Sequence, residues 1–423
     1  MVINARNNPN YGGNLINQKY SPLTDIVIPD DQGAAYKQLF TKRAQKLTET
    51  GCYPPNTTLK LYANWPADTN HDGIPDVNQD EIPMVVVSSN RANWMHTILD
   101  NANSRADFAD YLDSHTFDDD IVPWYAPLRS GRTLYVVVHW SEYNYYHDRI
   151  GNFADVKVIG YKFTPNENSL DIVGFGASRF AALQAMIDLG YHKIWAVDDN
   201  VVNINGFPAD LADIEGRMGD EIWGIGFRAA TENIQRAALY DGTVTFHAND
   251  INFDAAEPGL LQQATLWNLN LLRDNYVNFS PIFVTSNEDV SLSSFLQKKD
   301  YDERLITALS IIKIEPENDP YNPEDMSGNN NLGGAVEVPQ RRRRIYSMFN
   351  LIEEDLEINP GDGAVRLSGY IRNEREDVLL TQSRAVEQVL SASINKGSAY
   401  YPSEIFVHGN GEHYTQYLDA ADI

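Results

Sequence analysis

Short apolar runs alternate with amphipathic stretches through the middle of the chain. Four runs, at 82–87, 133–139, 156–159 and 194–197, have the length and composition of buried strands. Helical spacing of apolar residues follows or precedes them, at about 88–102, 141–149 and 174–189. Because strands that alternate with helices form parallel sheets covered on both faces, the pattern predicts an α/β fold with a mostly parallel, doubly wound sheet.

The last of these strands ends on three polar residues. The run Ile194 to Val197 leads directly into Asp198, Asp199 and Asn200. Consecutive carboxylates after a buried strand need partners or solvent, so we expect them to project from its carboxyl end into a cleft, where open α/β sheets hold ligands. A solvated acidic turn is the alternative.

The pattern becomes less regular after this turn. It predicts a strand at 221–227, a hairpin around Asp241 and Gly242, a helix at about 260–275, a strand at 282–284 and a helical pattern that opens at 285–292 and runs to about 297. An irregular α+β half of this kind, packed on a regular parallel half, often holds a second substrate.

Composition shifts divide the chain into four parts. Residues 1–81 are polar and turn-rich, with one credible helix at 32–50, and are interpreted as an N-terminal extension. Residues 82–315 form the central domain, 316–344 a polar linker, and 345–423 a C-terminal helical segment that packs on the central domain. The helices expected in this last part lie at 345–356 and 381–395.

Charge and cysteine content narrow the classes of partner. The chain has 423 residues, 33 basic and 59 acidic, for a net charge of −26, which repels nucleic acid and acidic membranes. One dense basic run, Arg341 to Arg344, is the exception. The single cysteine, and the lack of an apolar leader or of a run of membrane-spanning length, favour a soluble, cytosolic protein without a membrane partner.

An aspartate-rich stretch near residue 70 has the spacing of a calcium loop. Oxygen side chains alternate along it and a glycine follows the third, as in helix-flanked calcium loops; the candidate ligands are Asp68, Asn70, Asp72 and Asp76. The stretch also resembles thrombospondin type 3 and dockerin repeats. Only one copy is present and Gln79 stands where a closing acid is usual, so a plain solvated loop is the alternative.

Several of these features together resemble nucleotide-sugar glycosyltransferases of the GT-A fold. The resemblance covers roughly 82–315 and rests on the order of four motifs: Asn90-Arg91 after the first strand, Ala177-Ser178-Arg179 in the central helix, Asp198-Asp199-Asn200, and Asn287-Glu288-Asp289 about ninety residues later. The phrase around the acidic turn is similar to a branch found beside base-oxidising dioxygenases in phages and some eukaryotes, proposed to glycosylate hydroxymethylated pyrimidines in DNA.

The resemblance implies a metal-dependent transfer of sugar from a nucleotide-sugar donor, most simply a UDP-sugar, to a hydroxyl acceptor. It implies that 82–315 is the catalytic domain, with a GT-A-like sheet and an acceptor-side irregular half. The implied roles are donor binding by Asn90, Arg91, Arg179 and Asp198, binding of Mn²⁺ or Mg²⁺ by Asp198, Asp199, Asn200 and His408, and catalysis at the acceptor by Glu288 and Asp289. Asn200 departs from the family, which has a second metal-ligating aspartate there, and His413 competes with His408.

Other readings of the same residues remain. Glu288 and Asp289 are also a favourable helix N-terminus, and acids at strand ends also serve nucleotidyltransferases, although no glycine-rich loop with a lysine follows the first strand. The acceptor is a modified DNA base, a protein side chain or a glycan. A non-catalytic alternative is a calcium-stabilised acidic binding or structural protein.

Overall fold

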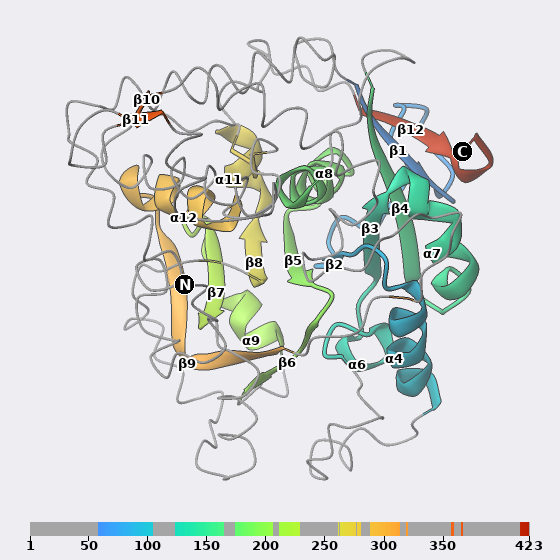
Figure 1. Ribbon diagram of the computed structural model, residues 1–423, viewed down its shortest axis with the longest axis horizontal. Helices are drawn as coiled ribbons and strands as arrows, with labels where there is room; N and C mark the ends of the chain where they lie inside the picture. The colour runs from blue at the N-terminus through green and yellow to red at the C-terminus, as the bar shows by residue number, and fades with distance from the viewer. Residues whose placement is uncertain are drawn as a thin grey trace.

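A mixed ten-stranded sheet runs through the protein (Figure 1). The computed structural model describes residues 58–104, 123–164, 174–205, 211–228, 261, 263–275, 277–280, 288–313, 319, 357–358, 365–366 and 415–422. Within these residues the sheet order is β12 (Thr415–Asp419), β1 (Thr58–Ala63), β4 (Val156–Thr164), β3 (Leu134–His139), β2 (Met84–Val87), β5 (Lys193–Asp198), β8 (Ala264–Asn268), β7 (Gly224–Arg228), β9 (Glu303–Lys313) and β6 (Val201–Asn205).

The centre of the sheet is parallel and changes direction of winding once. Strands β4, β3, β2 and β5 are neighbours in this order, and all three of their pairings are parallel. The chain therefore winds from β2 outward through β3 and β4, and then returns to β5 on the other side of β2. At such a switch point the loops after the two strands separate, which is where open α/β sheets bind ligands. The register places Val87 of β2 opposite Asp198 of β5, so both strands end there together.

The second half of the sheet is mixed. Strand β8 is antiparallel to both β5 and β7, whereas β7 and β9 are parallel. Strand β9 is long enough to pair also with β6, which it meets in antiparallel fashion with Val201 opposite Lys313. Because Val201 follows the acidic turn, the end of β9 lies beside the switch point.

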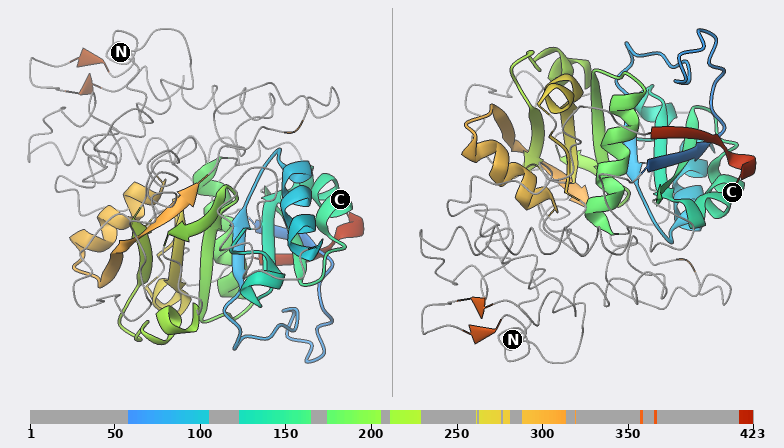
Figure 2. Two further views of the ribbon diagram at one scale, coloured as in Figure 1. Left: turned by 90° about the horizontal axis from the view of Figure 1, so that it is seen from below. Right: turned by 90° about the horizontal axis from the view of Figure 1, so that it is seen from above.

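Helices cover both faces of the sheet (Figure 2). One core contains side chains of α8 (Phe175–Asp188), α11 (Leu269–Asp274) and α12 (Glu288–Lys298). The other contains side chains of α4 (Ala92–Ser104), α7 (Tyr143–Ile150) and α9 (Leu211–Gly216). Strand β2 shows why its sequence is uniformly apolar: Val85 faces the first core, while Met84 and Val86 face the second.

Short elements complete the described structure. They are α6 (Pro127–Ser130), the 3₁₀ turns η3 (Trp140–Glu142) and η8 (Ala420–Asp422), and a separate antiparallel pair formed by β10 (Glu357–Ile358) and β11 (Val365–Arg366).

The α/β class, the covering of both faces and the four central strands are confirmed, as is the helical pattern that runs to about 297, which forms α12 from Glu288. The helix predicted at about 260–275 is confirmed only in its second part, as the short helix α11, and is wrong before it, where residues 264–268 form strand β8. The spacing of its apolar residues fits a helix, but all five residues of β8 are buried between neighbouring strands, so sheet pairing prevails over local spacing. Asn268 then caps α11 through its side chain.

Both ends of the chain contribute strands to the sheet. Strand β1 comes from the part we interpreted as an extension, and it pairs with β4 and with β12. Strand β12 comes from the part expected to be helical. The predicted helices at 32–50, 345–356 and 381–395, the hairpin near Asp241 and the strand at 282–284 lie outside the described residues.

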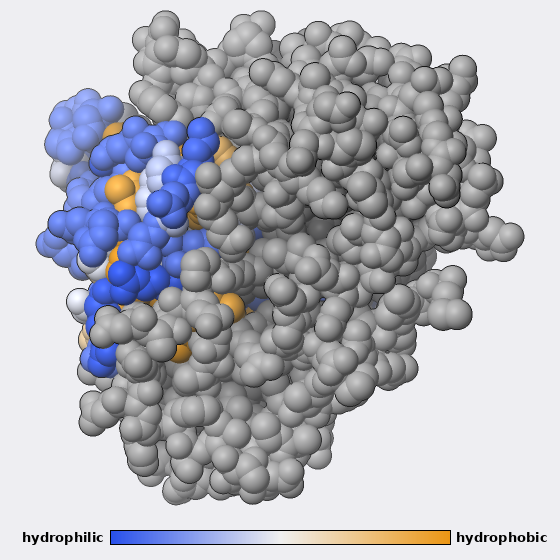
Figure 3. Space-filling view, turned by 90° about the vertical axis from the view of Figure 1, so that its left-hand side faces the viewer, coloured by the Kyte–Doolittle hydropathy of each residue, from blue (hydrophilic) through white to orange (hydrophobic). Residues whose placement is uncertain are grey.

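The described surface is largely polar. The described residues that Figure 3 colours, on the side of α12 and β9, are mostly hydrophilic, with small separate apolar areas. Leu128, 52% exposed, is the one large hydrophobic side chain that is exposed among the described residues. No helix in the described ranges is both long and apolar enough to cross a membrane.

Candidate functional site

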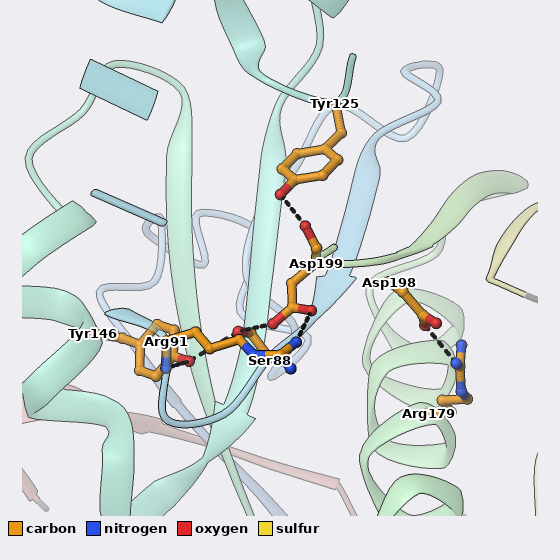
Figure 4. A network of polar contacts seen from close by, with 7 residues as sticks. All are labelled: Ser88, Arg91, Tyr125, Tyr146, Arg179, Asp198 and Asp199. Atoms are coloured by element: carbon orange, nitrogen blue, oxygen red, sulfur yellow. Dashed lines mark hydrogen bonds and ion pairs between the residues drawn. The ribbon is translucent and has the colours of Figure 1, made fainter. Parts of the chain in front are cut away.

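A buried ion pair joins the two loops at the switch point (Figure 4). Arg91, at the start of α4, places Nη1 2.7 Å from Oδ1 of Asp199, which follows β5. Oδ2 of Asp199 accepts a hydrogen bond of 2.6 Å from Ser88, at the end of β2. Tyr125 donates to the backbone carbonyl of Asp199 at 2.6 Å. Both oxygens of the Asp199 carboxylate therefore have partners inside the protein, and the carboxylate holds the loop after β2 against the turn after β5.

Tyr146 of α7 extends this network, and the partners of its hydroxyl determine which group donates in each hydrogen bond. Its hydroxyl lies 2.9 Å from Ser88 Oγ and accepts from the backbone N–H of Arg91 at 3.0 Å. Since a carboxylate accepts, the Ser88 hydroxyl donates to Asp199 and must itself accept from Tyr146. Burial, with the nearby Glu142 and Asp199 charges, raises the pKa of Tyr146 well above its ordinary value. The hydroxyl therefore stays protonated, as this chain of donors requires.

Glu142 supports the same loop from η3. Its carboxylate accepts from Ser89 Oγ at 2.7 Å and from the backbone N–H of Asn90 at 2.9 Å. Asn90 adopts the left-handed conformation, with φ of 57°, which non-glycine residues rarely take. Two carboxylates, Glu142 and Asp199, thus fix the conformation of residues 88–91.

A second network lies on the other side of β5. Arg179 of α8 places Nη2 2.5 Å from Oδ1 of Asp198 and Nε 2.9 Å from Oε1 of Glu288, the first residue of α12. Asp198 is 90 positions from Glu288 along the chain, yet one guanidinium contacts both. The side chains of Arg179 and Glu288 are 10% and 6% exposed, while that of Asp198 is 17% exposed. The acidic turn and the acids of α12 are therefore brought together.

The second network has more acidic than basic side chains: Asp198, Glu288 and Asp289 surround the single Arg179. Burial, followed by the charge of Asp289, raises the pKa of Glu288 to about 8, and the Arg179 charge offsets only part of this. Burial acts to lower the pKa of Arg179, but the combined charges of Asp198, Glu288 and Asp289 outweigh it and raise that pKa further, so the guanidinium stays charged. A carboxyl group with a pKa near neutrality is suited to accept or give a proton.

The two adjoining aspartates point to different partners, as Figure 4 shows. Asp199 faces Arg91 and Ser88, whereas Asp198 faces Arg179. In the described part of the chain Arg179 is the partner of the Asp198 carboxylate, through Oδ1, which leaves Oδ2 available to a ligand. Asn200 is buried on the same turn.

The oxygen side chains at the acidic turn fit a cation that is held jointly by the protein and a diphosphate, and not a metal centre built from protein ligands alone. Within the described ranges no three His, Cys, Asp or Glu side chains cluster in a way that holds a metal. Asp198 and Asn200 are hard oxygen ligands, and Mg²⁺ or Mn²⁺ bound with a diphosphate needs only one or two carboxylates from the protein. His408 and its competitor His413 lie outside the described residues, as do Asn287 and the run Arg341 to Arg344.

The aspartate-rich loop near residue 70 is exposed and internally hydrogen-bonded. The Asp68 carboxylate accepts from the backbone N–H groups of Asp72 and Gly73, and the Asp72 carboxylate accepts from that of Ile74. Asp76 accepts from Thr69, which lowers the pKa of Asp76. Asn70 accepts from Asp72 N–H. The expected ligands thus lie on one tight turn, and calcium binding there stays a prediction.

Several residues of the networks were not among the expected site residues. Ser88 and Glu142 follow strands, a signal that the sequence does carry. Tyr146 and Tyr125 carry no signal of this kind, because a tyrosine in an apolar stretch looks like an ordinary core residue.

Comparisons with known proteins do not place the chain in a family: no protein-family model matches it, and no curated protein is significantly similar to it.

Proposed function

We propose that this protein is a glycosyltransferase that moves a sugar from a nucleotide-diphosphate donor to a hydroxyl acceptor, with a divalent cation. The observation that carries the proposal is that Arg179 contacts both Asp198 and Glu288. Transfer of this kind needs a group that neutralises the leaving diphosphate beside an acid that accepts the acceptor's proton. Arg179 is itself a group that can neutralise the diphosphate. It contacts Glu288, the candidate base, and Asp198, the candidate cation ligand, so all three groups lie together.

The fold supports the same assignment. The parallel half ends at a switch point with polar side chains on both of its strands, Ser88 on one and Asp198 on the other, which suits the nucleotide. The mixed half begins at strand β8, which is antiparallel to β5. It contributes α12, whose acids Glu288 and Asp289 are suited to take the proton of the acceptor. A parallel donor half joined to an irregular acceptor half is the arrangement expected of a GT-A-like sheet.

Each residue then has a definite part in the transfer. The acceptor oxygen attacks the anomeric carbon, the bond from that carbon to the diphosphate oxygen breaks, and the electron pair leaves with the diphosphate. Glu288, in its ionised form, accepts the proton of the acceptor hydroxyl, with Asp289 as the neighbouring alternative, as in an inverting transfer. Arg179 is positioned to neutralise charge on the diphosphate.

Asp198 and Asn200 would hold the divalent cation, which supplies further charge neutralisation at the leaving group when bound. Asp199 has a different part in this proposal from the one the motif implies. Because its two carboxylate oxygens bond to Arg91 and Ser88, we assign Asp199 to the positioning of Arg91 and the turn, and the cation to Asp198 and Asn200. Asn90 and Arg91 then contribute to donor binding through the conformation of their loop, which these contacts fix.

The charge of the protein bears on the acceptor. Three carboxylates, those of Asp198, Glu288 and Asp289, act on the single Arg179 charge, and the whole chain carries −26. These charges favour a neutral hydroxyl acceptor, of a glycan or a protein side chain, over a polyanion. A hydroxymethylated base in DNA would need a basic contact, and Arg341 to Arg344 are the residues to test for it.

A thermal-shift panel of nucleotide sugars with and without manganese tests the proposal. A ligand at a hundredfold excess over its dissociation constant stabilises the native state by about 2.7 kcal/mol. We expect one UDP-sugar to raise the unfolding temperature in the presence of manganese, and Asp198→Ala to remove that shift. Asp213→Ala is the matched control, because Asp213 of α9 forms a partly exposed pair with Arg217, just after that helix. No shift with any nucleotide would contradict the proposal.

A further inference from the structure

Asp319 reaches the start of α4 from far along the chain. Its carboxylate Oδ2 accepts from the backbone N–H of Asn93 at 3.0 Å and from the Tyr145 hydroxyl at 2.6 Å. Its own backbone N–H donates to the carbonyl of Asn90 at 2.9 Å. Asp319 is 7% exposed. We call Asp319, Asn90, Asn93 and Tyr145 the clasp.

The clasp replaces a cap that the local sequence does not provide. Helix α4 begins at Ala92, and the first N–H groups of a helix need acceptors from outside it. Serine, threonine, asparagine or aspartate usually supplies one from the residue before the helix, but Arg91 holds that position and its side chain pairs with Asp199. Asp319 supplies the acceptor instead, and its negative charge also suits the positive end of the helix.

The clasp also holds the strained residue of the switch-point loop. Asn90 has φ of 57°, and its N–H and C=O bond to two different elements, Glu142 of η3 and Asp319. A residue in this conformation persists when its surroundings fix it. The next residue, Arg91, is the one that pairs with Asp199, so the position of that guanidinium depends on the backbone that the clasp fixes.

The topology gives the clasp a further consequence. Lys313, the last residue of β9, pairs with Val201 beside the acidic turn, and Asp319 comes six positions later. Lys313 therefore lies beside the turn after β5, and Asp319 contacts the loop after β2. Strand β9 follows α12, which carries Glu288 and Asp289, so Asp319 comes soon after the acceptor-side acids in the sequence and contacts the donor-side loop.

We infer that Asp319 is a positioning residue of the donor site, which sets the Asn90–Arg91 loop, and through it the Arg91–Asp199 pair, for a nucleoside diphosphate. The inference rests on the proposed function for the identity of the ligand. Asp319 touches no reacting atom in this account and acts through the backbone of residues 90–93.

The experiment compares three variants of the full chain. Asp319→Ala removes the acceptor, whereas Asp319→Asn keeps an oxygen that can accept both hydrogen bonds. Asn268→Ala removes the cap of α11 and is the matched control, because Asn268 pairs with Lys193 at the opposite end of β5 from Asp198. For each protein, amide hydrogen exchange is measured for peptides covering 88–95 and 269–275, together with the affinity for UDP and manganese and the unfolding midpoint.

Asp319→Ala is expected to speed exchange in 88–95 and to weaken UDP binding by about tenfold, the scale set by the loss of a helix cap. Asp319→Asn should restore both properties. Asn268→Ala should speed exchange in 269–275 alone and leave UDP affinity unchanged, with a similar fall in the unfolding midpoint. The inference is overturned if Asp319→Ala weakens UDP binding no more than Asn268→Ala does, or leaves exchange in 88–95 unchanged.

Failure of the proposed function gives a different pattern. The wild-type protein would then bind no UDP, while Asp319→Ala would still speed exchange in 88–95. That result would remove the donor site, and with it the role of Asp319 in that site, but it would leave the clasp as a contact that orders the loop.

Discussion

Arg91 and Asp199 form a buried ion pair, 2.7 Å long, across the switch point of the sheet. Both side chains lie largely out of solvent, at 11% and 7% exposure. The pair joins the loop after β2 to the turn after β5, so it determines how the two strand ends face each other. Because its charges are desolvated, removing one partner leaves the other uncompensated.

Asp199→Ala is therefore expected to lower the free energy of unfolding by about 3–5 kcal/mol, the range for breaking a buried pair. Urea denaturation measures this change. The control is Asp213→Ala, which breaks the exposed pair with Arg217 and should cost less than about 0.5 kcal/mol. Similar losses in the two variants would mean that the Arg91–Asp199 pair does not hold the loops.

Tyr146→Phe removes the hydroxyl that links Arg91 N–H to Ser88. We expect a loss of about 1–3 kcal/mol, because a buried donor and a buried acceptor are left without their partner. The variant should also weaken UDP binding. Tyr135→Phe is the control, since it removes a buried hydroxyl bond to Tyr191 in the other core and should lower stability without changing UDP affinity. Unchanged UDP affinity in Tyr146→Phe would separate this tyrosine from the site.

Glu288 gives a prediction for the dependence of stability on pH. Burial raises its pKa from an ordinary value of 4.5 to about 8, so the folded protein binds its proton more tightly than the unfolded chain does. The cost of ionising Glu288 in the folded state is absent below pH 4.5, grows as the pH rises towards 8 and is constant above that. Relative to Glu288→Gln, the wild type should therefore lose more than about 1 kcal/mol of stability between these limits, since one pKa unit corresponds to about 1.4 kcal/mol.

The same titration should appear in catalysis. If Glu288 is the general base, the rate of transfer rises with pH up to about 8, because the ionised form accepts the proton.

The stability prediction for Glu288 has its own contradicting outcome. If the free energies of unfolding of the wild type and Glu288→Gln change in parallel with pH, the pKa of Glu288 is not raised.

Calcium binding by the loop at 68–76 is tested by chelation. Calcium in excess of its dissociation constant should raise the unfolding temperature, and a chelator should reverse the rise, because an ion that binds only the folded state stabilises it. Asp72→Ala should abolish the response. The Asp213→Ala protein should respond like the wild type. A plain loop, closed by its own hydrogen bonds, would show no response in any of these proteins.

The parallel half of the fold could be predicted from the sequence, but the assembly of the mixed half could not. Strands such as β2 and β3 are buried on both faces, so their apolar runs are unambiguous. Strand β8 has apolar residues at helical spacing, and pairing with β5 and β7 decides its structure. Strands β1 and β12 pair across most of the length of the chain, which no local pattern reveals.

The candidate site shows the same division. Asp198, Arg179 and Glu288 were expected from short motifs, and the structure brings them into contact. The sequence could not reveal that Asp199 turns the opposite way to pair with Arg91, because adjacent residues after a strand take directions set by the turn. Nor could it reveal Asp319, since a helix cap supplied from another part of the chain leaves no spacing to recognise.

The most direct test of the central claim, that Asp198 and Arg179 hold a nucleotide diphosphate beside Glu288, is the manganese-dependent release of UDP from a UDP-sugar. We predict release by the wild type that stops on chelation, falls on the order of 10²-fold in Asp198→Asn, the scale for losing one group that stabilises developing charge, and is unchanged in Asp213→Asn. Equal release by the wild type and Asp198→Asn, or no release with any UDP-sugar, would contradict the account.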